Sequence, residues 1–186
     1  MLGAVLAACA RAERMAGVIV VSADPVVAGL ARAFGAEVVP DHSPPRGMNA
    51  AVVIGCDAAD AAGADAALVL TGDLPLLEAD DIDTLIERLT GPRSVILVPS
   101  RDGTGTNAML LAGPRVLAPQ LGPDSLALHT AQARERQLAL THLHLESIAL
   151  DIDTSGDLMV LERQRPGWID RALIDSAGRL AVGGSR

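Results

Sequence analysis

Short apolar segments alternate with longer, alanine-rich segments along most of this chain, and this alternation constrains the fold more than any other feature. The short segments have the length of buried strands, and the longer ones repeat apolar residues at helical spacing. Strands that alternate with helices typically form a mostly parallel sheet, because a parallel connection has to cross over, usually through a helix. Helices then cover both faces of the sheet. The sequence therefore predicts an α/β protein with three layers and a mostly parallel sheet.

Glycine, proline and capping residues mark the ends of the expected elements. The expected helices cover residues 2–15, 26–34, 47–62, 79–89, 125–137 and 154–163. The expected strands cover residues 18–21, 36–39, 67–71, 94–99, 107–111, 141–145 and 148–151. We assign residues 1–165 to one domain and treat residues 166–186, which show no clear periodicity, as a tail of uncertain order.

The composition excludes some classes of partner. Hydrophobic residues make up 49% of the chain and aromatic residues only 1%, so the core must consist of Ala, Val, Leu and Ile. The net charge is −8, and the chain has no Lys. We do not expect a nucleic acid as partner, because phosphate backbones require a basic face and unpaired bases stack on aromatic side chains.

Nothing in the sequence indicates a membrane segment or a disulfide. No apolar run has the roughly 18 residues that span a membrane. The apolar start of the chain lacks the positive region of a signal peptide, so we expect a cytoplasmic protein with no membrane partner. Cys9 and Cys56 form no CxxC pair and are expected to be buried free thiols.

Two short acidic motifs follow expected strands. Asp73 comes directly after the strand expected at 67–71, and Asp151 and Asp153 lie at the end of the strand expected at 148–151. In open α/β sheets, ligands bind outside the carboxyl ends of the strands. Residues two apart in an extended segment point to the same side. Three carboxylates around one opening repel each other unless a cation neutralises them, and hard oxygen ligands favour Mg²⁺ or Mn²⁺, which suggests phosphoryl or nucleotidyl transfer.

Purely structural interpretations of the acidic motifs remain open at this point. Asp73 precedes Leu and Pro, so it also suits a turn or the cap of the helix expected at 79–89. The segment around Asp151 and Asp153 suits the cap of the helix that follows it. The location of both motifs at expected strand ends favours the metal site.

A glycine-rich loop and a helix start form a second group of candidates. Residues 101–107 include two glycines, which allow the backbone to approach a ligand closely, and Thr106 offers a hydroxyl group. Gly122 and Ser125 precede the helix expected at 125–137, where amide groups attract anions. His129 lies one turn after Ser125 on the same face. A hairpin loop, a helix cap and a structural histidine are the alternatives.

Two weaker candidates complete the set. Gly47 and Asn49 begin the helix expected at 47–62, and the Asn49 amide can either read a nucleobase edge or cap the helix. His142 and His144 share one face of an expected strand, a spacing that zinc can use. Because neither a Cys nor a third His is near them in the sequence, zinc is the less favoured interpretation.

The ordered set of motifs resembles the 2-phospho-L-lactate and phosphoenolpyruvate guanylyltransferases, which make the nucleotide-activated precursor of coenzyme F-420. The motifs are Val-Val-Ser-Ala-Asp, Gly-Ala-Glu-Val-Val, Gly-Met-Asn-Ala-Ala, Gly-Asp-Leu-Pro-Leu, Asp-Gly-Thr-Gly-Thr-Asn-Ala, Gly-Pro-Asp-Ser-Leu-Ala-Leu-His and Asp-Ile-Asp-Thr-Ser-Gly-Asp-Leu. The resemblance covers residues 2–162 and implies a nucleotidyltransferase fold of the nucleotide-diphospho-sugar transferase type. It implies GTP as donor, phosphoenolpyruvate or 2-phospho-L-lactate as acceptor, and pyrophosphate as the product that leaves.

The resemblance also implies a role for each candidate residue. The catalytic carboxylates, which would hold Mg²⁺ (or Mn²⁺) against the triphosphate, are Asp73, Asp151 and Asp153. The groups that would hold the acceptor are Thr106, Gly122 and Ser125, with His129 in reach of the same ligand. The residues that would lie near the guanine are Gly47 and Asn49. The oligomeric state is left open, with a homodimer as one option.

One expected feature is missing. Members of the resembled family begin with a strand and a loop whose Lys and Arg side chains hold the nucleotide phosphates, whereas this chain begins on a helix and has no Lys. We therefore expect either that another segment holds the triphosphate or that the sequence lacks its N-terminal strand and phosphate loop. The competing functions are a molybdenum-cofactor-type or other nucleotidyltransferase, and an inactive fragment that serves as a non-catalytic module.

Overall fold

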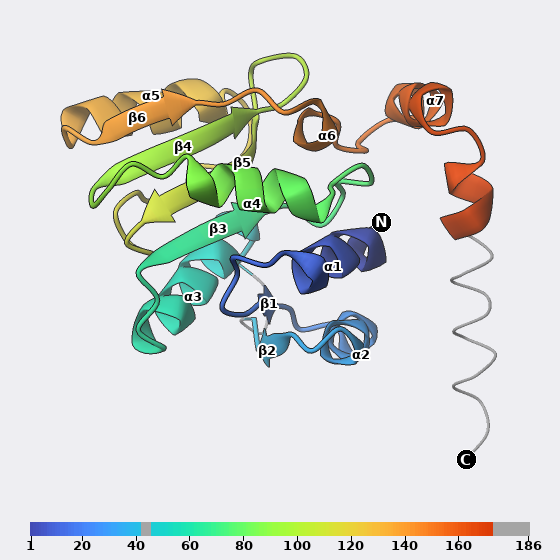
Figure 1. The fold of residues 1–186 in the computed structure, drawn as a ribbon, viewed down its shortest axis with the longest axis horizontal. Coiled ribbons are helices and arrows are strands. Elements are labelled where there is room, and N and C mark those ends of the chain that lie inside the picture. The colour runs from blue at the N-terminus through green and yellow to red at the C-terminus, as the bar shows by residue number, and fades with distance from the viewer. Residues whose placement is uncertain (42–45, 173–186) are drawn as a thin grey trace.

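The computed structural model describes residues 1–41 and 46–172, and it forms an α/β fold (Figure 1). The helices are α1 (Leu2–Arg11), α2 (Pro25–Ala33), α3 (Met48–Ala61), α4 (Ala79–Glu87), α5 (Ser125–Glu135), α6 (Glu146–Ala149) and α7 (Ser155–Gln164). The strands are β1 (Ile19–Val21), β2 (Glu37–Val39), β3 (Ala66–Leu70), β4 (Ser94–Pro99), β5 (Thr106–Ala112) and β6 (Ala139–His142). None of the described helices is long and apolar enough to cross a membrane.

The described strands form two sheets. The larger one has the order β3-β5-β4-β6, and the smaller one pairs β1 with β2 in parallel. Strand β6 is parallel to β4, and β5 runs antiparallel to both β3 and β4, so β3, β4 and β6 share one direction. The carboxyl ends of β3 and β4 therefore lie at the same edge as the start of β5.

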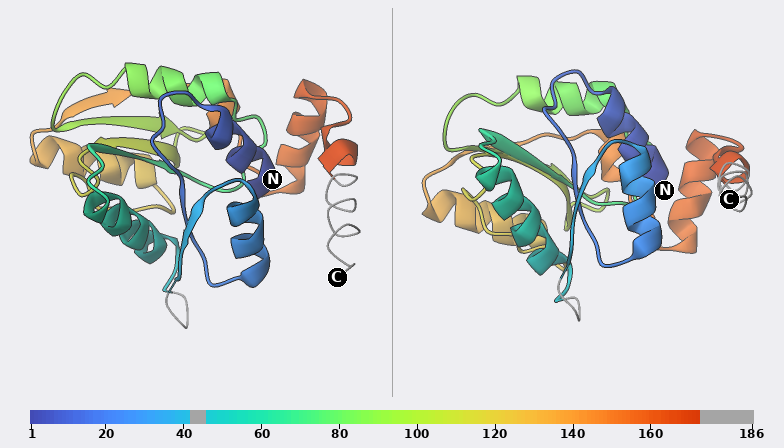
Figure 2. Two further views of the ribbon diagram at one scale, coloured as in Figure 1. Left: turned by 60° about the horizontal axis from the view of Figure 1, so that its bottom comes forward. Right: turned by 90° about the horizontal axis from the view of Figure 1, so that it is seen from below.

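Helices cover both faces of the larger sheet (Figure 2), which confirms the expected three layers. Along β4, Ile96 and Val98 pack in a cluster with residues of α1 and α4, whereas Val95 and Leu97 pack in a second cluster with residues of α3 and α5. Strand β5 divides its side chains between the same two clusters. This period of two is the pattern of a strand that is buried on both faces. As expected, Cys9 and Cys56 are buried free thiols.

Side-chain caps mark the start of α2 and of α7. The Asp24 carboxylate accepts hydrogen bonds from the amides of Val26 and Val27, with Pro25 at the first helical position of α2. Helix α7 begins with a reciprocal capping box between Thr154 and Asp157. The cap of α7 matters for function because Asp157 also lines the pocket described below.

One expected strand is wrong. Residues 148–151 do not form a strand, because Ile148 and Ala149 end the short helix α6 and Leu150 continues as extended backbone. The run is apolar because all three side chains are buried, and periodicity cannot distinguish a short buried helix from a short buried strand. The strand expected at 141–145 is also displaced, since β6 covers Ala139–His142 and pairs with β4.

The expected tail begins within the described residues. Residues 168–172 are helical, and Trp168 packs against a cluster that includes Leu76, Leu150 and Leu161. Residues 173–186 lie outside the described residues, so the domain boundary at residue 165 stays a prediction.

Candidate functional site

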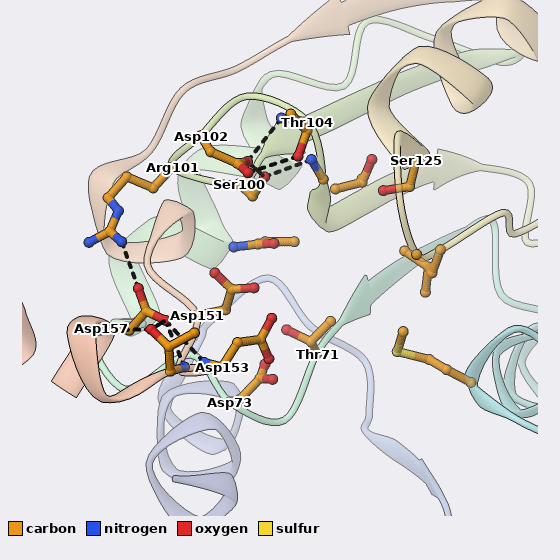
Figure 3. Close-up of a pocket in the computed structure, with 17 residues that line it drawn as sticks. Thr71, Asp73, Ser100, Arg101, Asp102, Thr104, Ser125, Asp151, Asp153 and Asp157 are labelled. Atoms are coloured by element: carbon orange, nitrogen blue, oxygen red, sulfur yellow. Dashed lines mark hydrogen bonds and ion pairs between the residues drawn. The ribbon is translucent and has the colours of Figure 1, made fainter.

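A pocket of about 520 Å³ opens at the edge of the larger sheet where β3 and β4 end and β5 begins (Figure 3). The residues that line it are Met48, Thr71, Asp73, Ser100, Arg101, Asp102, Thr104, Gly105, Thr106, Asn107, Leu121, Gly122, Ser125, Asp151, Asp153, Thr154 and Asp157. Most of the candidates from the sequence therefore share this one pocket. The strand-end rule for open α/β sheets describes its location correctly.

The three acidic candidates meet on one side of the pocket. Asp73 follows β3, and Asp151 and Asp153 follow α6 rather than the expected strand. Figure 3 shows the three carboxylates close together beside Thr71. One buried oxygen of Asp73 (Oδ1) and the buried hydroxyl of Thr71 have no hydrogen-bond partner within the described residues. Buried polar atoms without a partner are uncommon and call for a missing ligand, ion or water.

The electrostatics of this side disfavour further negative charge. Burial raises the pKa of the Asp151 carboxyl, and the charges of Asp153 and Asp73 raise it further. A nearby cation would lower that pKa again, because it favours the charged form of the carboxyl. A hydrogen bond from the Asn107 side chain also lowers the pKa of Asp151 and so opposes part of the increase that burial causes.

These residues fit a hard divalent cation. Carboxylate and hydroxyl oxygens are the donors that Mg²⁺ prefers, and Mg²⁺ usually keeps several waters or phosphate oxygens as further ligands. Within the part of the chain that the structure describes, no group of three or more acidic, His or Cys side chains is arranged so that it could hold a metal ion by itself. An ion at this position would therefore need ligands from water or from a bound phosphate in addition to the protein.

Asn107 positions the segment that carries Asp151. Its side chain is buried, and its amide nitrogen donates to the carbonyls of Ile148 at 2.9 Å and Ala149 at 3.2 Å. In the same region, the amide of Arg101 donates to the Ala149 carbonyl at 2.8 Å. The end of α6 is thus attached to β5 and to the loop that follows β4, although α6 lies far from both in the sequence.

The loop between β4 and β5 is held by its own polar side chains. Asp102 accepts hydrogen bonds from the Ser100 hydroxyl at 2.6 Å and from the amide and hydroxyl of Thr104 at 3.0 and 2.9 Å. These bonds lower the pKa of Asp102 to about 2. The Ser100 hydroxyl in turn accepts from the Gly105 amide at 2.7 Å. The loop expected to approach a ligand is therefore an ordered wall of the pocket.

Arg101 connects this wall to the acidic side. Its guanidinium pairs with Asp157 at 2.6 Å, and it is the one cationic side chain among the described residues that line the pocket. A hydrogen bond from Thr154 is the main cause of the lowered pKa of Asp157, and Arg101 adds to the effect. The expectation that another segment holds the triphosphate stays a prediction.

The opposite side of the pocket offers hydroxyl groups. Thr106 begins β5 and Ser125 begins α5, and both residues are almost fully buried while lining the pocket. The Ser125 amide already donates to the Gly122 carbonyl, and the Leu126 amide donates to the Thr104 carbonyl. The expected attraction of an anion to the first two amides of this helix is therefore weakened, and the Ser125 hydroxyl is a further donor on this side of the pocket.

Two of the predicted ligand contacts have another role in the structure. His129 does not line the pocket, because it is buried behind Thr106 and hydrogen-bonds to its hydroxyl at 3.1 Å. Asn49 uses both ends of its amide on the backbone of Leu121, at 3.0 and 2.7 Å. A direct contact of Asn49 with guanine would require the amide to release Leu121, so that prediction stays untested.

Gly47 and Gly122 both have a left-handed backbone, with φ of 92° and 125°. Gly122 lines the pocket, whereas Gly47 caps α3 just before the pocket residue Met48. His142 and His144 lie away from the pocket, and His142 contacts the Thr130 hydroxyl at 2.9 Å. These contacts do not support the zinc alternative.

The sequence interpretation missed three residues that shape the pocket, namely Asn107, Arg101 and Asp157. Asn107 and Arg101 lie within the glycine-rich motif that attracted attention for its threonines. Asp157 lies three residues after Thr154, which is the signature of a capping box. That signature indicates a helix start but does not indicate the ion pair with Arg101.

Comparison with known proteins places this chain in a family. Residues 1–145 match the model of the MobA-like NTP transferase domain. A phosphoenolpyruvate guanylyltransferase from Sphaerobacter thermophilus is 40% identical over 166 residues, which cover 89% of this chain and 79% of that protein. A 3-phospho-D-glycerate guanylyltransferase from Phenylobacterium zucineum is 39% identical over 136 residues, which cover 72% of this chain and 61% of that protein.

A solved structure shares the fold. The putative nucleotide-diphospho-sugar transferase from Desulfovibrio desulfuricans superposes with a TM-score of 0.68 at 16% identity, over 87% of this chain and 71% of that chain. The resemblance read from the ordered motifs is therefore confirmed, and so is the nucleotidyltransferase type of the fold. This chain belongs to the family of MobA-like NTP transferases, and it is a nucleotidyltransferase of the guanylyltransferase type.

Proposed function

We propose that this protein transfers GMP from GTP to phosphoenolpyruvate and releases pyrophosphate. One observation carries the proposal: a single pocket has carboxylates suited to a cation on one side and buried hydroxyl donors suited to an anion on the other. The relatives named as phosphoenolpyruvate guanylyltransferases support the choice of donor and acceptor. 2-Phospho-L-lactate and 3-phospho-D-glycerate are the acceptors that have to be tested against phosphoenolpyruvate.

The acidic side would hold Mg²⁺, with Mn²⁺ as the alternative. Asp73, Asp151 and Asp153 would contact the ion, and the unpartnered Oδ1 of Asp73 supports this assignment. When bound, the ion neutralises the triphosphate and so reduces its repulsion of an anionic acceptor. Without an ion, the three carboxylates would repel the triphosphate.

The hydroxyl side would hold the acceptor. Thr106 and Ser125 donate to its phosphate or carboxylate, and Gly122 allows close approach of the backbone. A phosphate oxygen of the acceptor attacks the α-phosphorus of GTP, the new O–P bond forms, and the bond to the β-phosphate breaks as pyrophosphate leaves. Positioning and electrostatics supply the rate, and no covalent enzyme intermediate is needed. Gly47 and the Asn49 segment would border the guanine.

The test measures pyrophosphate release from GTP and Mg²⁺ with each of the three acceptors. We expect turnover with phosphoenolpyruvate, loss of turnover in Asp73→Asn and in Asp151→Asn, and full turnover in the control Asp80→Asn. Asp80 lies in the exposed first turn of α4, outside the pocket, and undergoes the same chemical change.

Full activity of Asp73→Asn or Asp151→Asn would refute the metal assignment. Preference for another acid would refute the acceptor assignment. A pterin phosphate is run as a fourth acceptor, and turnover with it but with none of the three acids would indicate the molybdenum-cofactor type. A folded protein that turns over no acceptor would favour a non-catalytic module. We further propose that the enzyme acts in the cytoplasm and that its product is the activated precursor of coenzyme F-420.

A further inference from the structure

His129 is buried without a charged partner and is not part of the pocket wall. The residue is 0% exposed, and both of its ring nitrogens have hydrogen-bond partners. Its Nε2 lies 2.8 Å from the backbone nitrogen of Gln120, and its Nδ1 lies 3.1 Å from the Thr106 hydroxyl oxygen. Buried polar atoms are normally hydrogen-bonded, so the two bonds satisfy the ring and also fix its orientation. The informative feature is that one of the two partners is a hydroxyl group of a pocket residue.

These two contacts determine which ring nitrogen carries the proton. The backbone N–H of Gln120 can only donate, so Nε2 must accept and must be unprotonated. A neutral imidazole carries its one proton on the other nitrogen. The ring therefore donates Nδ1–H to the Thr106 oxygen, and the reverse bond from Thr106 to His129 is excluded.

The direction of that bond decides what Thr106 can do in the pocket. Because the Thr106 oxygen receives the histidine proton, its own O–H must point elsewhere. Thr106 is 4% exposed and lines the pocket, and its hydroxyl has no second partner within the described residues. The hydroxyl proton is thus available to an acceptor atom in the pocket.

We propose that His129 is a positioning residue that fixes the Thr106 hydroxyl as a hydrogen-bond donor toward an anionic oxygen of the acceptor substrate. The proposal rests on the proposed function and deepens it, because it names the residue that orients the Thr106 hydroxyl. The ligand atom that this donor fits is an ionised phosphate or carboxylate oxygen of the acceptor. A ligand that presents a protonated or uncharged group here loses a charge-assisted hydrogen bond, which is roughly twice as strong as a neutral one.

The first test reads the tautomer directly in the full chain. Nitrogen chemical shifts and ring couplings measured by NMR at neutral pH distinguish Nδ1–H from Nε2–H. We expect His129 as the neutral Nδ1–H form, with and without phosphoenolpyruvate. An Nε2–H form or a charged ring would overturn the proposal. This measurement does not depend on turnover, so it stands even if the proposed reaction fails.

The second test uses two substitutions that each keep one of the two contacts. The amide nitrogen of Asn reaches approximately where Nδ1 lies, so His129→Asn keeps the donor to Thr106 and loses the bond from Gln120. The amide oxygen of Gln reaches approximately where Nε2 lies, so His129→Gln keeps the bond from Gln120 and loses the donor. The readout is the KM for phosphoenolpyruvate, with the KM for GTP and the thermal stability as controls.

We expect His129→Gln to raise the KM for phosphoenolpyruvate about 10-fold, as for a lost hydrogen bond to a charged group, with the KM for GTP unchanged. His129→Asn should keep the KM for phosphoenolpyruvate at its wild-type value. If His129→Asn instead raised the KM for phosphoenolpyruvate and His129→Gln did not, His129 would serve only to hold the Gln120 segment. That result would overturn the proposal.

Thr106→Val removes the hydroxyl and serves as the second half of a double-mutant cycle. If His129 acts through Thr106, His129→Gln should add no further increase in KM on the Thr106→Val background. Additive effects would overturn the proposal. If the wild-type protein turns over no acceptor, the proposed function fails, and the same cycle is read from phosphoenolpyruvate binding by calorimetry.

Discussion

Acidification should destabilise this protein through the buried side chain of His129. Burial lowers the pKa of His129 to about 4, compared with 6.5 for an ordinary histidine. The unfolded chain then binds more protons than the folded chain between these two values, so stability rises with pH through that window and is lost as the pH falls. The histidine contributes its full stabilisation above pH 6.5.

The size of the effect follows from the same two values. The difference of about 2.5 between the two pKa values, at about 1.4 kcal/mol for each unit, gives a loss of about 3.5 kcal/mol once the pH is well below 4. The residue is 0% exposed, so solvent screening reduces this figure little. For a domain with a stability of about 5–15 kcal/mol, a loss of this size is substantial.

The assay is urea unfolding at a series of pH values from about 7.5 to about 4.5, where we expect a loss of about 2–3 kcal/mol. His129→Gln cannot titrate and serves as the control, so its stability should change much less. The raised pKa of Asp151 acts with the opposite sign, because that contribution is lost as the pH rises. The Asp151 contribution is the same in the wild-type protein and in His129→Gln, so it cancels when the two free energies of unfolding are subtracted. Equal pH dependence in both proteins would refute the reasoning.

Two further predictions concern the acidic side of the pocket. Mg²⁺ at about 100 times its dissociation constant should stabilise the wild-type protein by about 2.7 kcal/mol in urea unfolding. It should not stabilise Asp151→Asn. Equal stabilisation of both proteins would contradict the metal assignment. Asn107→Leu removes the donor to the Ile148 carbonyl and one of the two donors to the Ala149 carbonyl, which keeps the Arg101 amide. It should cost about 1–3 kcal/mol in urea unfolding and should abolish the stabilisation by Mg²⁺. A cost below about 0.5 kcal/mol, which is typical of surface changes, would show that Asn107 does not hold α6.

Most of the fold could be predicted because its signals are local. The strands at β4 and β5 are apolar runs bounded by turn residues, and the start of α2 is marked by Asp24 and Pro25. The failure at residues 148–151 has the opposite cause. Asn107 on β5 donates to two carbonyls at the end of α6 and so supports this helical turn. A contact between segments so far apart along the chain produces no periodic pattern in the sequence.

The candidate site divides in the same way. The strand-end rule was sufficient to expect Asp73 at the pocket, and the motif order was sufficient to indicate the family. Asp151 lies beside Asp73 as expected, but it follows α6 and not the expected strand. The roles of His129 and Asn49 could not be predicted, because a side chain that contacts a ligand and one that supports a neighbour look identical in a sequence. Their partners, Thr106 and Leu121, are distant along the chain, and only packing brought them within hydrogen-bond distance.

The sequence by itself determined most of the elements, the alternation that builds the layers, and the set of polar residues able to serve a nucleotidyltransferase. These properties depend on periodicity, capping and residue chemistry within a few residues. The tertiary structure alone decided that Arg101 pairs with Asp157, that Asp151 follows a helix, and that His129 donates to Thr106. Hydrogen-bond direction and burial depend on which segments meet in space, and those encounters are set by the packing of the whole chain.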